Sequence, residues 1–241
     1  MHEQDHVHTP EAIRTRLTRG PKAHYLREWV YGGIDGVVTT FAIVAGVTGA
    51  SLSPVIVIIL GLANLIGDGF SMAASAYSSA RTDEDSYAHL RAIERRHIDK
   101  DPEGEKEEIR QIYAKKGFAG KDLEKVVNTI ARDRKIWIDV MMQEEYGISP
   151  ALKTPLRIGF HTFIAFALCG AIPLLPFVIG TTQAFGTALA LSALTFFAIG
   201  SFKSRWSVSA WWRHGLETTL IGLTAAGLAY FIGYWLRGLG L

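Results

Sequence analysis

Seven side chains in the middle of the chain are potential metal ligands, because they recur at the spacing of about one helical turn. Residues three or four apart on a helix project from the same side, so each group can chelate one ion. Glu-x-x-His is also the ligand spacing of di-iron carboxylate bundles. Charged helices produce single pairs by chance, whereas three groups on one short segment indicate a metal-binding unit. The predicted ligands are Glu94, His97, Glu105, Glu108, Met141, Met142 and Glu145.

A second set of polar residues lies inside long apolar runs. Asp35 is the clearest case, because it sits in "GGIDGVVTTF" with two threonines as the nearest polar side chains. An ionisable group inside a bilayer is costly and must face a cavity or a partner, so it marks a functional site by default. The alternative is a structural hydrogen bond or a position at the water interface. The residues predicted to lie on an ion pathway within the apolar runs are Asp35, Thr39, Asn64, Asp68, Met72 and Glu217.

The spacing of three of these residues narrows the choice of cation. Asn64, Asp68 and Met72 are four residues apart and share one helix face. Calcium and magnesium prefer oxygen ligands only, whereas a thioether favours a transition metal. Met72 alone would be more typical of packing, but its alignment with Asp68 favours a role as a ligand.

Composition separates the chain into membrane and soluble parts. Hydrophobic residues make up 49% of the 241 residues, and most charged side chains fall in residues 81–157 or near the N-terminus. A bilayer imposes such a contrast. The net charge of +2 gives no reason to expect nucleic acid as a partner. Cys169 is the only cysteine, which excludes an intrachain disulfide or a thiolate cluster within one chain.

The fold class predicted from these patterns is an all-α membrane protein with five transmembrane helices. About 20 apolar residues are needed to cross a bilayer as a helix. The second run should continue beyond the membrane as one helix, because its end "SAYSSARTDED" remains compatible with a helix. The five runs of sufficient length are 30–50, 54–80, 156–178, 183–202 and 213–236.

A cytoplasmic three-helix metal-binding insert is predicted between spans two and three. "DPEGE" should separate its first helix from its second, and the third is expected as one helix over 121–147, ended by Gly147 and Pro150. The predicted domains are an N-terminal tail, spans one and two, the insert, and spans three to five. Their residue ranges are 1–28, 29–80, 81–154 and 155–241.

Loop charges predict the topology. The segment before span one and the loop between spans four and five are basic, whereas the turns at 50–54 and 179–182 carry no charge. Basic loops stay in the cytosol, so the N-terminus and the insert are expected inside. Short termini without sorting segments suggest a bacterial cytoplasmic membrane, with the vacuolar membrane as the expectation for a eukaryotic chain.

Two long motifs resemble the signatures of the vacuolar iron transporter family, which exports divalent metals. They are "DGVVTTFAIVAGVTGA" in span one and "GLANLIGDGFSMAASAY" in span two. The likeness covers most of the chain from about residue 27, and the arrangement of five spans around a helical insert is also similar.

The resemblance implies a homodimer with an ion path at the two-fold interface, lined by spans one and two of each subunit. It places the family's transport-site residues on Asp35 and Met72. The family's insert ligands fall on Glu94, Glu105, Glu108, Met141, Met142 and Glu145. His97 stands where the family commonly has a second Glu, which leaves the number and preference of bound metals open.

The sequence therefore predicts a transporter, not an enzyme. It should export Fe(II), with Mn(II), Co(II) and Zn(II) as further candidates, in exchange for inward protons. Asp68 or Glu217 could relay protons. A membrane-anchored di-iron oxidase or iron-storage protein, or a metal sensor, would explain the insert but leaves Asp35 and Met72 without a role.

Overall fold

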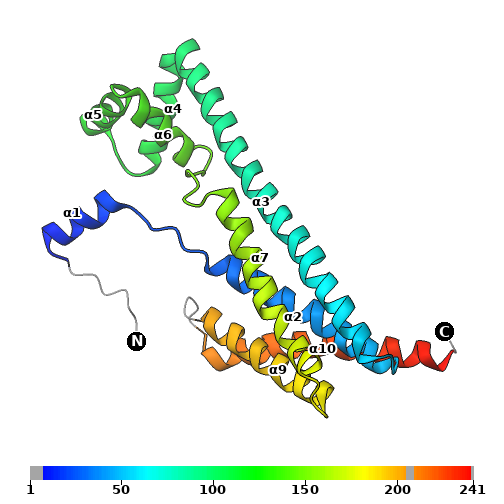
Figure 1. The fold of residues 1–241 in the computed structure, drawn as a ribbon. Coiled ribbons are helices and arrows are strands. Elements are labelled where there is room, and N and C mark those ends of the chain that lie inside the picture. The colour runs from blue at the N-terminus through cyan, green and yellow to red at the C-terminus, as the bar shows by residue number, and fades with distance from the viewer. Residues whose placement is uncertain (1–7, 205–208, 240–241) are drawn as a thin grey trace. The chain divides into compact units, whose positions relative to one another are not determined.

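The computed structural model describes residues 8–204 and 209–239, and every regular element within these ranges is helical (Figure 1). Its contacts divide the chain into two compact units. One unit comprises Met1–Ser78 with Lys153–Leu241, and the other comprises Ser79–Leu152. The helix α3 contributes residues to both. The elements of the first unit are α1 (Pro10–Arg19), α2 (Leu26–Gly49), α3 (Pro54–Lys100), α7 (Pro155–Ala171), the 3₁₀ turn Ile172–Leu174, α8 (Leu175–Ile179), α9 (Ala184–Lys203) and α10 (Trp211–Gly238).

Five stretches of helix among the described residues are long and apolar enough to cross a membrane. They are α2, α3, the continuous stretch from α7 to α8, α9 and α10, so the predictions of an all-α fold and of five spans are confirmed. The prediction that the second run continues as one helix is also confirmed, because α3 runs unbroken from Pro54 to Lys100.

Helix α2 is the centre of the first unit and packs against α7, α9 and α10. Two of its glycines allow this packing. A Cβ on Gly36 would stand 2.3 Å from the Phe166 carbonyl oxygen on α7, and one on Gly49 would stand 2.2 Å from the Tyr230 carbonyl oxygen on α10. Larger residues would push the helices apart. These two glycines therefore allow α2 to approach α7 and α10 closely, as small residues commonly do between membrane helices.

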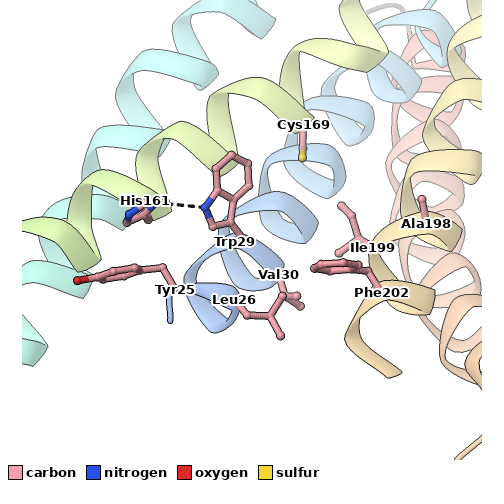
Figure 2. Close-up of a pocket in the computed structure, with 9 residues that line it drawn as sticks. All are labelled: Tyr25, Leu26, Trp29, Val30, His161, Cys169, Ala198, Ile199 and Phe202. Atoms are coloured by element: carbon pink, nitrogen blue, oxygen red, sulfur yellow. Dashed lines mark hydrogen bonds between the residues drawn. The ribbon is translucent and has the colours of Figure 1, made fainter. Parts of the chain in front are cut away.

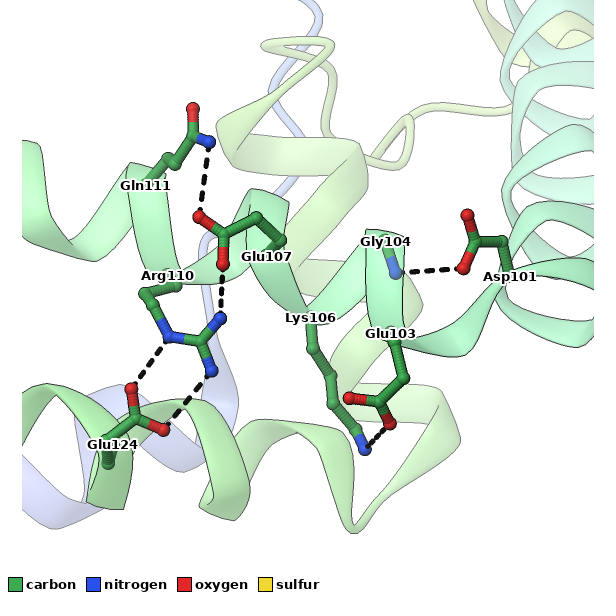
Figure 3. Close-up of polar contacts among 8 residues, drawn as sticks. All are labelled: Asp101, Glu103, Gly104, Lys106, Glu107, Arg110, Gln111 and Glu124. Carbon is green, nitrogen blue, oxygen red and sulfur yellow. Dashed lines mark hydrogen bonds and ion pairs between the residues drawn. The ribbon is translucent and has the colours of Figure 1, made fainter.

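The second unit consists of the last turns of α3 with α4 (Pro102–Lys115), α5 (Gly120–Ala131) and α6 (Arg134–Glu144). Asp101 ends the long helix and begins α4, where its side chain accepts a hydrogen bond from Gly104 N at 3.0 Å. Arg110 on α4 reaches Glu124 on α5 with an Nε–Oε1 distance of 2.7 Å and also pairs with Glu107 (Figure 3). Buried Ile109, Val127 and Trp137, with their apolar neighbours, form the core.

The prediction of one helix over 121–147 was wrong. α5 ends at Ala131, and α6 begins at Arg134. Asp133 explains the break, because its carboxylate accepts the backbone N–H groups of Lys135 at 2.8 Å and Ile136 at 3.1 Å. This N-cap starts a new helix in place of the expected continuation.

Candidate functional site

Glu94, His97 and Glu105 bring their ligand atoms together in the second unit. One oxygen of each carboxylate and one ring nitrogen of His97 all lie within 4.8 Å of one another. Nδ1 of His97 is 3.6 Å from Oε1 of Glu105. An ion with bonds of about 2.1 Å holds its ligand atoms within about 4.2 Å of each other, so small side-chain rotations would close this cluster around a metal.

The two carboxylates of this cluster are buried and incompletely paired. Glu94 is 0% exposed and Glu105 6% exposed. Glu94 Oε1 and Glu105 Oε2 have no hydrogen-bond partner among the described residues. Burial, followed by interactions with Glu94 and Glu108, raises the pKa of Glu105 to about 8. Buried polar atoms normally find a partner, and a cation at this point would provide one to both carboxylates.

Further acidic and phenolic groups surround the cluster. Burial raises the pKa of Glu145, and the charges of Glu108 and Glu105 raise it further. The side chains of both Glu108 and Glu145 are exposed. The hydroxyl of Tyr146 donates to Glu94 Oε2 at 3.4 Å, and burial raises the pKa of Tyr146 to about 12. The phenol is therefore protonated at neutral pH and can orient Glu94.

Met141 and Met142 occupy a different environment from these carboxylates. They are 0% and 1% exposed and belong to the apolar core of the unit with Ile109 and Trp137. Their role as ligands stays a prediction. Their packing role follows directly from the structure, because buried Met side chains fill irregular gaps in cores.

The first unit, which contains the membrane-spanning helices, has a cavity of about 1080 Å³. Residues of α2 and of α3, the two spans that carry Asp35 and Asp68, line it together. Asp35 of α2 lines it, and Asp68 and Met72 of α3 line the same cavity. Two carboxylates and one thioether are therefore available within one space. Hard oxygen and soft sulfur ligands together favour a divalent transition metal over calcium or magnesium.

Thr39 and Asn64 are not among the described residues that line this cavity, although each lies one helical turn from a lining residue and the two contact each other. Asn64 Nδ2 donates to Thr39 Oγ1 at 3.0 Å and to Thr40 Oγ1 at 3.2 Å. Glu217 is also absent from the described lining of the cavity. Its Oε2 lies 3.5 Å from Nδ1 of His214, and His214 does line the cavity. The structure thus links Glu217 to the cavity through His214.

Sequence reasoning missed the basic side of the cavity. Lys203 and Arg27 line it together with His24 and His214. Lys203 and Arg27 contribute to the basic segments from which the topology was predicted, but their place in the lining of the same cavity as Asp35 depends on helix packing. Cationic side chains in the same cavity would offset part of the negative charge of the two carboxylates whenever no metal is bound.

A second cavity, of about 750 Å³, lies among α2, α7 and α9 (Figure 2). Its described lining is mostly apolar and aromatic and contains no carboxylate. His161 lines it, but its Nδ1 already accepts the indole N–H of Trp29 at 3.1 Å, and its ring stacks on Tyr25. This cavity is therefore a poor candidate for a cation path.

Comparisons with known proteins agree on one family. The model of the VIT family matches residues 26–234. The chain is 32% identical to the vacuolar iron transporter of Toxoplasma gondii, over 98% of this chain and 78% of that one. It is 33% identical to vacuolar iron transporter 1 of Arabidopsis thaliana, over 85% and 83%, and 30% identical to the vacuolar iron transporter of Plasmodium berghei, over 88% and 82%.

Proposed function

Because the chain belongs to the VIT family, we propose that it is a membrane transporter that moves divalent transition metals, with Fe(II) as its principal cargo. The similar proteins named above are called iron transporters. The observation that carries the proposal is the cavity lined jointly by Asp35, Asp68 and Met72 in the membrane-spanning unit. Ionisable side chains at this depth are costly unless a cavity or a partner accommodates them.

The cavity residues have complementary roles in this proposal. Asp35 supplies an anionic oxygen that replaces part of the hydration shell of the ion. Met72 supplies a soft sulfur that stabilises Fe(II) or Mn(II) more than Mg(II). Asp68 is exposed at the cavity wall and attracts the cation toward the other two ligands.

The second unit captures metal before transport. Glu94, His97 and Glu105 form its central site, and Glu108 and Glu145 add negative charge around them. The unpartnered buried atoms Glu94 Oε1 and Glu105 Oε2 support this assignment. Met141 and Met142 are proposed to complete the ligand set after a change of rotamer, since they are packed in the core.

Protons are proposed as the counter-ions. Metal and proton compete for the same carboxylate oxygens, so release of one favours binding of the other. Glu217 and His214 are the proposed relay, because their side chains pair at 3.5 Å and His214 lines the cavity. Mn(II) is proposed as a second cargo, because it accepts the same ligand set.

We propose that two copies form the functional path. Asp68 is exposed on α3 between exposed Ile66 and Phe70. A carboxylate at this position would be costly against lipid. A second copy that covers this face of α3 would enclose the carboxylate and complete the cavity wall. We propose that the N-terminus and residues 79–152 lie in the cytosol, because the basic segments around the spans favour that side of the membrane.

Metal uptake into sealed proteoliposomes tests the proposal. Purified full-length protein should load vesicles with Fe(II). The lumenal pH should rise at the same time, because protons leave the vesicle in exchange for the metal that enters. Vesicles that contain the protein but accumulate no more metal than empty vesicles would refute transport.

A di-iron oxidase is the alternative that a specific observation favours, namely the Glu94, His97 and Glu105 cluster. Oxygen consumption with Fe(II) separates the two readings. The transporter should move Fe(II) under anaerobic conditions without consuming an oxidant. Oxygen-dependent turnover without vesicle uptake would instead support the oxidase.

A further inference from the structure

Helix α1 carries a short apolar stripe, Ile13 and Leu17, that is not buried within the described chain. The helix has no buried residue, and Leu17 is 73% exposed. Ile13 and Leu17 are four residues apart and therefore lie on one side of the helix. Thr9 caps its N-terminus by accepting from Ala12 N at 3.3 Å, and Gly20 ends it with a φ of 63°. The stripe thus belongs to a defined helix.

Basic side chains flank this stripe on both sides. At 100° per residue, Arg14 lies next to Leu17 on one side of the stripe, and Arg16 lies next to Ile13 on the other. Arg19, in the last turn, lies beside Thr15 on the side of the helix away from the stripe. None of the three arginines forms an ion pair within the part of the chain that the structure describes. Glu11 is the one acidic residue of the helix.

The distance between α1 and the membrane is limited, because only a short connection joins α1 to the first membrane-spanning helix. Six residues, 20–25, join α1 to α2, which is the first membrane-spanning helix (Figure 1). Six extended residues reach about 20 Å at most. The connection therefore keeps α1 next to the bilayer at all times, and this high local concentration makes even a weak surface contact effective.

We propose that α1 lies on the membrane surface and binds the headgroups of anionic phospholipids through Arg14 and Arg16. Ile13 and Leu17 enter the boundary between headgroups and acyl chains, and the long arginine side chains reach outward to the phosphates. Basic residues next to a span are attracted to anionic lipid in this way. The contact is independent of metal binding and therefore stands apart from the proposed transport function.

Spin labels on the full-length protein in lipid nanodiscs test this contact. With Cys169 replaced by Ala, a single cysteine is introduced either by Ile13→Cys on the stripe or by Thr15→Cys on the opposite side. In nanodiscs of equal parts phosphatidylglycerol and phosphatidylcholine, the label at residue 13 should be relaxed by oxygen more than by a water-soluble nickel chelate. The label at residue 15 should show the reverse order.

Two comparisons make the result specific. Nanodiscs of phosphatidylcholine alone, or high salt, should return the label at residue 13 to water, because the attraction is electrostatic and screened. Replacing Arg14 and Arg16 by Gln should do the same, with the surface equilibrium weakened about fivefold per arginine. Two Lys→Gln changes in the second unit remove the same charge and should leave the contact intact. The exposed control positions are Lys121 and Lys125.

Two outcomes would overturn the proposal. A label at residue 13 that is equally open to water in both lipids would mean that α1 does not touch the bilayer. A label that is protected from both reagents in both lipids would mean that α1 packs against protein.

Discussion

The side-chain amide of Asn64 on α3 donates hydrogen bonds to two hydroxyls of α2, Thr39 Oγ1 at 3.0 Å and Thr40 Oγ1 at 3.2 Å. Thr39 in turn donates to the backbone carbonyl of Asp35 at 2.9 Å. A chain of hydrogen bonds thus connects the helix that carries Met72 to the backbone of Asp35. It holds two spans in register beside the cavity that Asp35, Asp68 and Met72 line.

Asn64→Leu should loosen this register. The side-chain volume is similar, but Thr40 is fully buried and would lose its interhelical donor. Hydrogen bonds between membrane helices contribute about 0.6 kcal/mol on average, so thermal unfolding in detergent should shift only modestly while metal uptake slows. Asn128→Leu on the exposed surface of α5 is the matched control and should leave uptake unchanged. Uptake at the wild-type rate in Asn64→Leu would show that this hydrogen bond does not position the cavity.

Met72→Leu should reduce selectivity for transition metals. Leu conserves the volume of Met, so the cavity should keep its shape and lose only the sulfur. We expect Fe(II) and Mn(II) uptake to fall and competition by Mg(II) to increase. A metal panel measured on the same proteoliposome preparation gives the answer. An unchanged ranking of metals would assign Met72 to packing alone.

Metal binding to the second unit should strengthen as pH rises toward 8 and should level off above it. The pKa of Glu105 is raised from 4.5 to about 8, so below that pH the carboxyl carries a proton that the metal must displace. Displacement of one proton changes the apparent affinity about tenfold per pH unit below the pKa and little above it. Calorimetric titration of the full-length Asp35→Asn protein with Zn(II) isolates this site from the cavity. Glu105→Gln should flatten the profile, and an identical slope in that variant would exclude Glu105 as the competing group.

Lys153 and Glu28 should matter for stability more than for metal specificity. Lys153 Nζ lies 2.8 and 3.0 Å from the two oxygens of Glu28, whose side chain is only 8% exposed. Removal of one partner from a buried pair costs about 3 kcal/mol, because the other charge stays buried. Lys153→Met should therefore lower the unfolding temperature clearly. Lys153→Arg keeps the positive charge and should lower the unfolding temperature much less. Equal unfolding temperatures for wild type and Lys153→Met would show that the pair contributes nothing net.

The helices were predictable where one physical signal dominates. The five apolar runs led to the five spans, because the bilayer demands about 20 apolar residues whatever the tertiary packing. The family resemblance of the two motifs is also confirmed by the match over residues 26–234. The break between α5 and α6 was missed because Asp133 lies within a strongly helical pattern. Asp followed by a new apolar run was the available signal.

For the two sites, the sequence could predict which residues share a face of one helix, but not which residues of different helices come together. The spacing of Glu94 and His97 is visible in the sequence, but their approach to Glu105 depends on the reversal at Asp101 between α3 and α4. The basic residues that line the cavity could not be predicted from the sequence, because Lys203 reaches the cavity from the end of α9 through tertiary packing. The burial of Met141 likewise depends on how α6 packs in the core.

Uptake of Fe(II) by proteoliposomes that contain Asp35→Asn tests the central claim most directly. The substitution preserves shape and removes the charge that faces the cavity. Asp122→Asn on exposed α5 is the matched control. We predict that Asp35→Asn folds, reconstitutes at the wild-type level and loses nearly all Fe(II) uptake, while Asp122→Asn transports normally. Uptake by Asp35→Asn at the wild-type rate would contradict a metal path through this cavity.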